Sequence, residues 1–384
     1  MAIDNKDKKV LNVPHLRFPE FSGEWKKHSL GEIGETIIGL TYKPSDVVDN
    51  NGIIVFRSSN IKNGMIDYSD LVRVNKHIKD KIITKENDIL VCARNGSQRL
   101  IGKNAIIKQE DANNTFGAFM MVYRANDNPF ILPLLSTKKY FSQVGENLGA
   151  RINQITTSDF NGFEFYFPEN HAERTKIAEL FRLLDERIAT QNKIIEDLKK
   201  LKSAISERLF NAIKGDVVVL EDIGDVVKGK QINGEFLSES GKYYVMNGGI
   251  EPSGFYNDYN VEANTISISE GGNSCGYVQF NACPFWSGGH CYTIQNTTDN
   301  VKTEYLYQFL KSKESEIMKL RIGSGLPNIQ KKDLAKFKIT IPNISEQKVI
   351  SAFLSSFERK ADVEMNFVNL LLEEKQYLLR QMFI

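Results

Sequence analysis

The sequence predicts an α+β protein with an internal duplication: two β-rich mixed α/β domains in tandem, separated by two long antiparallel coiled-coil helices, so that the chain has pseudo-two-fold symmetry. Two observations predict this arrangement. Two long helical stretches carry the same apolar frame at a constant offset, as from Ile177 to Ile350 (350 − 177 = 173). The segments upstream of them also match, since residues 29–39 correspond to 219–229 and residues 148–168 to 322–342.

The first β-rich domain is expected at residues 20–168, after a polar N-terminal arm at residues 1–19. Alternating apolar and β-branched residues predict strands at 52–59, 88–94, 100–108 and 117–125. Asn95-Gly96 is a tight-turn signal between the second and third of these strands. Residues 130–147 are expected to be helical.

The first long helix is expected at residues 169–214. Its apolar residues recur at alternating spacings of four and three, which places them on one stripe of a helix. Asn170 and Glu173 form a capping-box-like start, as Asn343 and Glu346 do in the second copy, and Gly215 is expected to end the helix.

The second domain, at residues 215–342, and the second long helix, at 343–384, repeat this order. Residues 264–280 read as strand, polar glycine-rich turn and strand, with Gly276 where the first copy has Gly102 (276 − 102 = 174), and Arg94 facing Glu270. Residues 303–320 replace the short helix.

Polar residues interrupt the apolar stripe at the same places in both long helices. Gln191 matches Glu364, and Lys202 matches Lys375. A polar residue in a coiled-coil seam costs stability and fixes the register, so the matched interruptions indicate that the two helices pair.

Composition excludes several classes of protein. No apolar run approaches the ~20 residues needed to cross a bilayer, and the polar N-terminus lacks a secretory h-region. A cytoplasmic protein is therefore expected. Cys275, Cys283 and Cys291 lie beside His290 but lack the close cysteine pair of zinc sites, so no metal is expected.

No catalytic motif is present. Residues 96–104 resemble a P-loop only at a glance, because five residues separate the glycines and Asn104 replaces the Ser or Thr that would hold Mg²⁺. Residues 127–130, DNPF, lack the second proline of the adenine methyltransferase motif, and no triad-like cluster appears.

The polar turns of the two domains carry side chains suited to DNA. Arginine reads guanine, Asn and Gln read adenine, a carboxylate accepts from cytosine, and hydroxyls hold phosphates. The alternative is that these are ordinary solvated turns. The candidate DNA contacts are Lys43, Arg57, Ser58, Ser59, Asn60, Arg94, Asn95, Ser97, Gln98, Arg99 and Lys103 in the first domain, and Lys228, Lys230, Gln231, Asn247, Ser269, Glu270, Asn273, Ser274, Ser287 and His290 in the second.

The chain resembles the DNA specificity subunits of type I restriction-modification systems. The duplicated layout, the two domain openings at 29–39 and 219–229, and the tails DFNGFEFYFPENHAERTKIAELF and DLAKFKITIPNISEQKVISAFL carry the resemblance. It departs modestly where the first helix opens with HAER and the second with SEQK.

The resemblance implies a non-enzymatic reader of double-stranded DNA. Each domain would be a target-recognition domain for one half of a bipartite site, and the helices would be conserved spacers. Ile177 to Leu209 is 33 residues, or roughly 50 Å of helix, which fits half-sites more than one DNA turn apart.

The resemblance also implies partner subunits that carry out the chemistry. Through them the chain would take part in phage defence. Two modification subunits would bring S-adenosylmethionine and methylate adenine, and two restriction subunits would bring ATP and Mg²⁺, while this chain would hold no cofactor. Two other classes stay open: a single-chain DNA methyltransferase or nuclease, which should carry a catalytic motif, and a coiled-coil adaptor that binds only protein.

Overall fold

The computed structural model describes residues 12–148, 153–323, 325 and 327–384. The first eleven residues of the expected arm, and residues 149–152, 324 and 326 of the matched segments, lie outside it. The chain forms two compact units. Unit 1 comprises residues 1–190 and 367–384, and unit 2 comprises residues 191–366.

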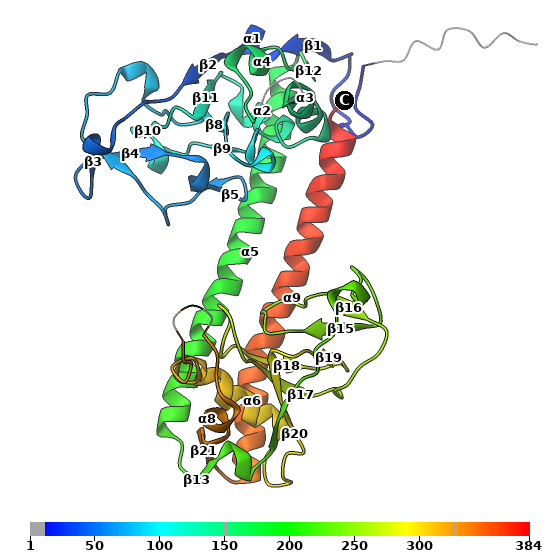
Figure 1. Ribbon diagram of the computed structural model, residues 1–384. Helices are drawn as coiled ribbons and strands as arrows, with labels where there is room; N and C mark the ends of the chain where they lie inside the picture. The colour runs from blue at the N-terminus through cyan, green and yellow to red at the C-terminus, as the bar shows by residue number, and fades with distance from the viewer. Residues whose placement is uncertain (1–11, 149–152, 324, 326) are drawn as a thin grey trace, which may run out of the picture. The chain divides into compact units, whose positions relative to one another are not determined.

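Unit 1 is built around an antiparallel sheet with the strand order β2-β11-β8-β9 (Figure 1). Its central strand β8 is buried on both faces: Ile89 and Val91 face one apolar cluster, and Leu90 and Cys92 face another. Successive side chains of a strand point to opposite faces, so a continuous apolar run marks a strand covered on both sides. The strands are β2 (Glu35–Ile38), β8 (Ile89–Cys92), β9 (Asn104–Ile106) and β11 (Met120–Arg124).

Other strands of unit 1 form smaller sheets. Their orders are β10-β4-β7-β3, β1-β12 and β5-β6. The predicted strands at 52–59, 88–94, 100–108 and 117–125 are confirmed, in shortened form, as β4, β8, β9 and β11. The bounds are β1 (Lys26–Ser29), β3 (Val47–Val48), β4 (Ile53–Phe56), β5 (Ile61–Lys62), β6 (Met65–Ile66), β7 (Arg73–Val74), β10 (Thr115–Phe116) and β12 (Glu164–Phe167).

Unit 2 repeats the central sheet as β14-β20-β17-β18, beside sheets ordered β16-β15-β19 and β13-β21. The edge pair β14-β20 matches β2-β11, since Asp225 lies opposite Gln295 as Glu35 lies opposite Arg124. The bounds are β13 (Asp216–Val219), β14 (Asp225–Lys228), β15 (Tyr243–Met246), β16 (Phe255–Tyr256), β17 (Thr265–Ser269), β18 (Val278–Asn281), β19 (Trp286–Ser287), β20 (Cys291–Gln295) and β21 (Lys338–Ile341).

Short helices complete each core. The single helix expected at 130–147 is two helices, because the Thr137 hydroxyl donates to the Leu134 carbonyl (2.7 Å) and accepts from the Tyr140 N–H (3.3 Å). The expected helix at 303–320 also breaks, at Lys313. The bounds are α1 (Leu30–Ile33), α2 (Asn128–Leu134), α3 (Lys138–Leu148), α4 (Thr157–Asn161), α6 (Thr303–Ser312), α7 (Glu314–Met318) and α8 (Lys331–Ala335).

The two long helices are α5 (His171–Ala212) and α9 (Ile344–Met382). In unit 2 the interrupting residues meet, as the buried Gln191 amide donates to the Glu364 carboxylate. The other matched pair forms equivalent ion pairs, Lys202 with Glu358 (2.7 Å) in unit 2 and Lys375 with Asp185 in unit 1. The predicted pairing of the two helices is confirmed.

The helix ends differ in part from the prediction. Asn170 and Asn343 do cap, accepting from the N–H groups of Ala172 and Glu346 (both 2.9 Å). The capping-box role expected for Glu173 and Glu346 is wrong, because Arg17 and Trp25 bind the Glu173 carboxylate and the Glu346 carboxylate makes no hydrogen bond among the described residues. Gly215 is no helix cap either. The helix ends at Ala212, and Gly215 lies where any side chain would strike the carbonyl of Ile341.

No helix in the described part of the chain is long and apolar enough to cross a membrane.

Candidate nucleic-acid interface

Equivalent turns follow the central strand of each sheet. In unit 1 the Gly102 N–H donates to the carbonyl of Cys92, the last residue of β8 (2.9 Å), and in unit 2 the Gly276 N–H donates to Ser269, the last residue of β17 (2.8 Å). Both glycines have positive φ, 81° and 92°, a conformation that glycine adopts without steric cost. The strand end and the glycine therefore fix both ends of a turn: residues 93–101 in unit 1 and 270–275 in unit 2.

The unit 1 turn presents cationic and amide side chains. Arg94, Gln98 and Arg99 are exposed, and the Arg94 guanidinium lies 5.2 Å from the centre of the Phe119 ring. The Asn95 amide donates to the Ser58 hydroxyl (2.8 Å), and its carbonyl accepts from the Ser97 N–H (3.0 Å). The structure thus brings the turn together with the segment after β4.

Two predicted contacts beside this turn are occupied by structural bonds. Arg57 pairs with Asp70 (2.8 Å), and its Nε is buried without a partner among the described residues. The Asn60 side chain is buried and donates to the carbonyls of Asp67 and Asp70 while accepting from the Arg57 N–H. Asn60 therefore shapes this segment.

The unit 2 turn begins at a nearly buried carboxylate. Glu270 is 7% exposed, and its Oε1 pairs with the Lys228 ammonium (2.6 Å) and accepts from the Tyr292 hydroxyl (3.0 Å). His290 Nδ1 lies 3.5 Å from Oε2. Burial, with a smaller contribution from Glu270, raises the pKa of Tyr292, so this hydroxyl stays protonated and donates.

The remaining residues of the unit 2 set divide by exposure. Asn273 is exposed and Ser274 half-buried in the turn. Asn247 accepts from the His290 N–H (3.2 Å), and the buried Ser269 hydroxyl donates to the Gly248 carbonyl (2.6 Å). Ser287 is also buried, and its hydroxyl faces the Cys291 carbonyl (3.4 Å).

Three candidates have side chains that, in the described part of the chain, are not bonded to either turn. Lys43 is exposed beside the short sheet of unit 1, and Lys230 and Gln231 are exposed after β14. Among the described residues, no side-chain hydrogen bond or ion pair links any of them to the turns. Lys103, half-buried, directly follows Gly102.

The expected correspondence of Arg94 with Glu270 is wrong by one residue. The Ile155 N–H donates to the Ala93 carbonyl (2.9 Å), and the Ile329 N–H donates to the Glu270 carbonyl (2.8 Å). Ala93 therefore occupies the place of Glu270. Arg94 corresponds to Gly271, and the two make matching isolated bridges to Gln154 and Asn328. The correspondence of Gly102 with Gly276 is confirmed.

The sequence reasoning missed Phe119. Its ring is 59% exposed beside Arg94, and an exposed aromatic ring next to an arginine is a typical stacking surface. Phe119 stands directly before β11 in a run that reads as a buried strand, so the pattern gave no sign of its exposure.

No metal-binding group of three or more His, Cys, Asp or Glu side chains occurs among the described residues. The four cysteines are free thiols, and only Cys283 is exposed. Burial raises the pKa of Cys92 and that of Cys291 to about 11, so these two thiols are protonated at neutral pH and poor metal ligands.

Residues 22–200 and 214–371 each match the family model of the type I restriction modification DNA specificity domain. The chain belongs to this family and carries the domain twice.

Named relatives agree with this membership. Over 161 residues the chain is 34% identical to a Mycoplasma pneumoniae protein assigned as a type I specificity subunit, a match covering 41% of the chain and 42% of the relative. It thus spans about two fifths of that relative's length. Over 406 residues it is 23% identical to the specificity subunit of the type I restriction enzyme MjaVIII of Methanocaldococcus jannaschii, covering 94% and 91%.

The fold also has a solved counterpart. The crystal structure of the S subunit of a type I restriction-modification system from M. genitalium matches with a TM-score of 0.64 at 20% identity, covering 97% of this chain and 99% of that one. The predicted α+β fold with tandem domains and long helices is confirmed.

Proposed function

We propose that this chain reads a bipartite sequence in double-stranded DNA, with one half read by each β-rich domain, and that it catalyses no reaction itself. The observation that carries the proposal is the pair of equivalent turns in two copies of one DNA specificity domain. The framework at each turn is the same, but the side chains differ, so each copy would select different bases.

The unit 1 turn supports direct readout of the major groove. Arg94, Gln98 and Arg99 are exposed and free to reach base edges, and arginine pairs with guanine while Gln pairs with adenine. In unit 2 the exposed amide of Asn273 and the Lys228–Glu270–His290 group fill this role. Ser269, Ser287 and Asn60 are buried, and we assign them to the support of these turns.

Four further candidates fit phosphate contacts. Lys43, Lys103, Lys230 and Gln231 lie away from the turn tips in sequence, and phosphate and sugar take half or more of protein–DNA hydrogen bonds. The net charge is only +1, so partner subunits would supply much of the attraction to phosphate.

The proposed domain boundaries follow from the duplication: target-recognition domains at residues 20–168 and 215–342, spacer helices at 169–214 and 343–384, and the arm at 1–19. The proposed partners are two modification subunits, with S-adenosylmethionine, and two restriction subunits, with ATP and Mg²⁺. The proposed compartment is the cytoplasm, where DNA and such partners are present.

The test is to co-express the chain with its modification subunit in a host free of DNA methylation and to map methyl-adenine across the genome. A split motif methylated on both strands is the expected result. A complex that assembles but methylates nothing would contradict the proposal and favour the protein adaptor.

Matched variants test whether there are two readers. Arg94→Ala or Gln98→Ala should relax one half of the motif only, by about 1–3 kcal/mol of discrimination per lost bidentate contact, and Asn273→Ala should relax the other half. Exchanging residues 216–342 for those of another family member should change a single half. A change in both halves would contradict the two-reader proposal.

A further inference from the structure

The N-terminal arm of unit 1, together with the residues that follow it up to Trp25, covers the place where α5 begins and α9 ends. The Arg17 guanidinium makes two hydrogen bonds to the Glu173 carboxylate, Nε to Oε1 (2.7 Å) and Nη2 to Oε2 (2.8 Å). The buried Trp25 indole donates to the same carboxylate (3.2 Å). Glu173 is completely buried, and a buried carboxylate is stable only when it is paired and hydrogen-bonded.

We call the helix surface that the arm covers, around Glu173 and the end of α9, the seat of the arm. Apolar and cationic contacts extend this seat along the arm. The Phe18 ring packs against the core of unit 1, and the Lys176 ammonium lies 4.5 Å from its centre while pairing with Glu20. The Leu16 N–H donates to the carbonyl of Gln381, near the end of α9 (2.9 Å). Thus the side chains of Arg17 and Phe18 cover the start of α5, and the backbone of Leu16, whose side chain is exposed, reaches the end of α9.

Unit 2 contains the same seat without an arm. At the constant offset of the duplication, Ala172, Glu173, Lys176, Ile177 and Met382 correspond to Ser345, Glu346, Val349, Ile350 and Leu209. These five residues of unit 2, together with Ala212 and Ile213, line an open and mainly apolar groove of about 450 Å³.

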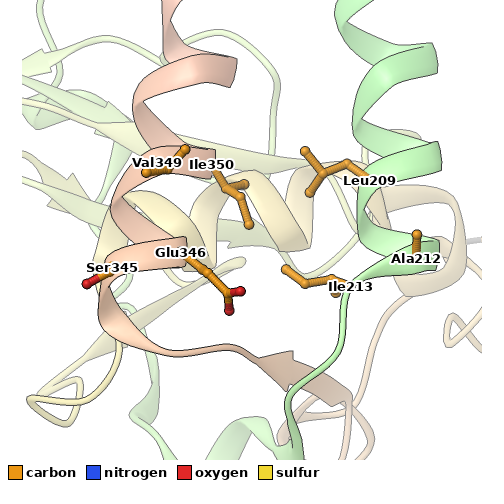
Figure 2. Close-up of a pocket in the computed structure, with 7 residues that line it drawn as sticks. All are labelled: Leu209, Ala212, Ile213, Ser345, Glu346, Val349 and Ile350. Carbon is orange, nitrogen blue, oxygen red and sulfur yellow. The ribbon is translucent and has the colours of Figure 1, made fainter.

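Unlike the covered seat of unit 1, the groove leaves a carboxylate without a partner among the described residues and an apolar side chain exposed. Figure 2 shows Glu346 and Ile350 of α9 pointing across the groove toward Leu209 of α5 and toward Ile213, which directly follows α5. The Glu346 carboxylate is exposed and makes no hydrogen bond or ion pair within the described residues, and Val349 is 69% exposed. No separate arm covers the groove in unit 2, because the chain that leads into β13 is α5 itself. The residues that correspond to the arm therefore form the end of this helix.

We propose that this groove is a docking site for an extended segment of another protein that carries an arginine between apolar side chains, as Leu16-Arg17-Phe18 does in unit 1. The arginine would pair with Glu346, and its neighbours would cover Val349 and Ile350. Arginine suits this position because its planar fork matches a carboxylate with two hydrogen bonds. The proposal does not depend on DNA reading.

The probe is a fluorescent peptide of residues 12–25, NVPHLRFPEFSGEW, titrated by anisotropy against the full-length chain. Saturable 1:1 binding is expected. Glu346→Gln should weaken it about tenfold, the loss of one hydrogen-bonded charge pair, while Glu239→Gln, which changes an exposed glutamate outside the groove, should leave it unchanged.

Two further variants sharpen the assignment without disturbing the core, because position 349 is exposed. Val349→Lys recreates the counterpart of Lys176 and should tighten binding of this peptide through its Phe18 and Glu20. Val349→Glu should weaken it. A peptide with Arg17→Glu should fail on the unaltered chain and recover on the Glu346→Arg chain.

Three results would overturn the proposal. One is no saturable binding up to millimolar peptide. Another is binding that ignores both Glu346→Gln and Val349→Glu, since the peptide would then be exchanging with the arm of unit 1. The third is a concentration-dependent dimer in sedimentation that Glu346→Gln abolishes, which would assign the groove to a second copy of this chain.

Discussion

The two turns after the central strands, residues 93–101 and 270–275, share their ends and differ in everything between. Both leave an antiparallel ladder and return through a glycine N–H to the last strand carbonyl. The longer turn of unit 1 exposes Arg94 and Arg99, whereas the shorter turn of unit 2 begins at the nearly buried Glu270. The ladder and the glycine thus conserve the frame, and the side chains and length of the turn are free to diverge.

The helix pair is the element on which both units depend, so breaking it has the largest expected effect. Leu198→Pro removes an α5 backbone hydrogen bond and drives the ring against the preceding turn, which costs about 3 kcal/mol or more. We expect a large loss of thermal stability and no assembly with partner subunits, measured by calorimetry and size-exclusion chromatography.

Leu198→Ala is the matched control for that proline, because it keeps the helix backbone and removes only part of a half-buried side chain. It should assemble normally. Equal damage from both variants would mean that the side chain, and not helix continuity, is what matters.

Alanine at the two return glycines tests whether the frames are equally rigid. An added Cβ at Gly276 would lie 3.0 Å from the Cα of Met318, whereas at Gly102 it would meet only side-chain atoms of Tyr140 and Val144, at 3.1 Å. Both replacements also carry the strain of positive φ, roughly 1–2 kcal/mol. Gly276→Ala should therefore destabilise more than Gly102→Ala in denaturant unfolding, and the reverse order would contradict this account.

The anchored carboxylate of unit 2 gives a smaller effect. Glu270→Gln keeps an oxygen that can accept from Tyr292 but loses the ion pair with Lys228, whose side chain is 51% exposed. The amide leaves no buried charge behind, and water can solvate the half-exposed ammonium of Lys228 once its partner is gone, so stability should change little, by roughly the 0–1 kcal/mol of a surface ion pair. Methylation at one half of the motif should change nevertheless, and Ala93→Gln at the equivalent position should affect the other half.

The sequence was informative wherever a residue type answers to local geometry. The offset of 173 between the helices identified Gln191 with Glu364, and Lys202 with Lys375, as matched polar interruptions of the seam. The offset of 174 matched Gly102 with Gly276, and both glycines have positive φ. Periodicity and glycine both report on the backbone near the residue itself, so they could be read without the fold.

The features that could not be predicted from the sequence depend on contacts between distant parts of the chain. Glu173 looked like half of a capping box, but Arg17 and Trp25, which precede it by about 150 residues, take its carboxylate. Arg94 was aligned with Glu270 because the turns differ in length, and only the ladder shows that Ala93 is the true counterpart. Phe119 lies in an apolar run, and only the packing reveals its exposure.

Thiol reactivity compares the two units with the smallest perturbation, since the experiment changes no residue. Cys92 ends β8 and Cys291 begins β20, and burial raises the pKa of each from 9.0 to about 11. A pKa near 11 instead of 9.0 lowers the thiolate fraction at pH 8 roughly a hundredfold. Maleimide labelling followed by mass spectrometry should therefore modify the exposed Cys283 quickly and spare Cys92 and Cys291 until the chain unfolds.

The same shift has a consequence for stability. Between pH 9 and 11 the unfolded thiol loses its proton while the folded one keeps it, so the folded state binds more protons and stability falls as pH rises through this window. Cys92→Ala should reduce that slope in urea unfolding followed from pH 8 to 10. If Cys92 labels as fast as Cys283 in the folded chain, then β8 opens far more readily than a strand covered on both faces should, and the shared rigid frame of the two turns would have to be abandoned.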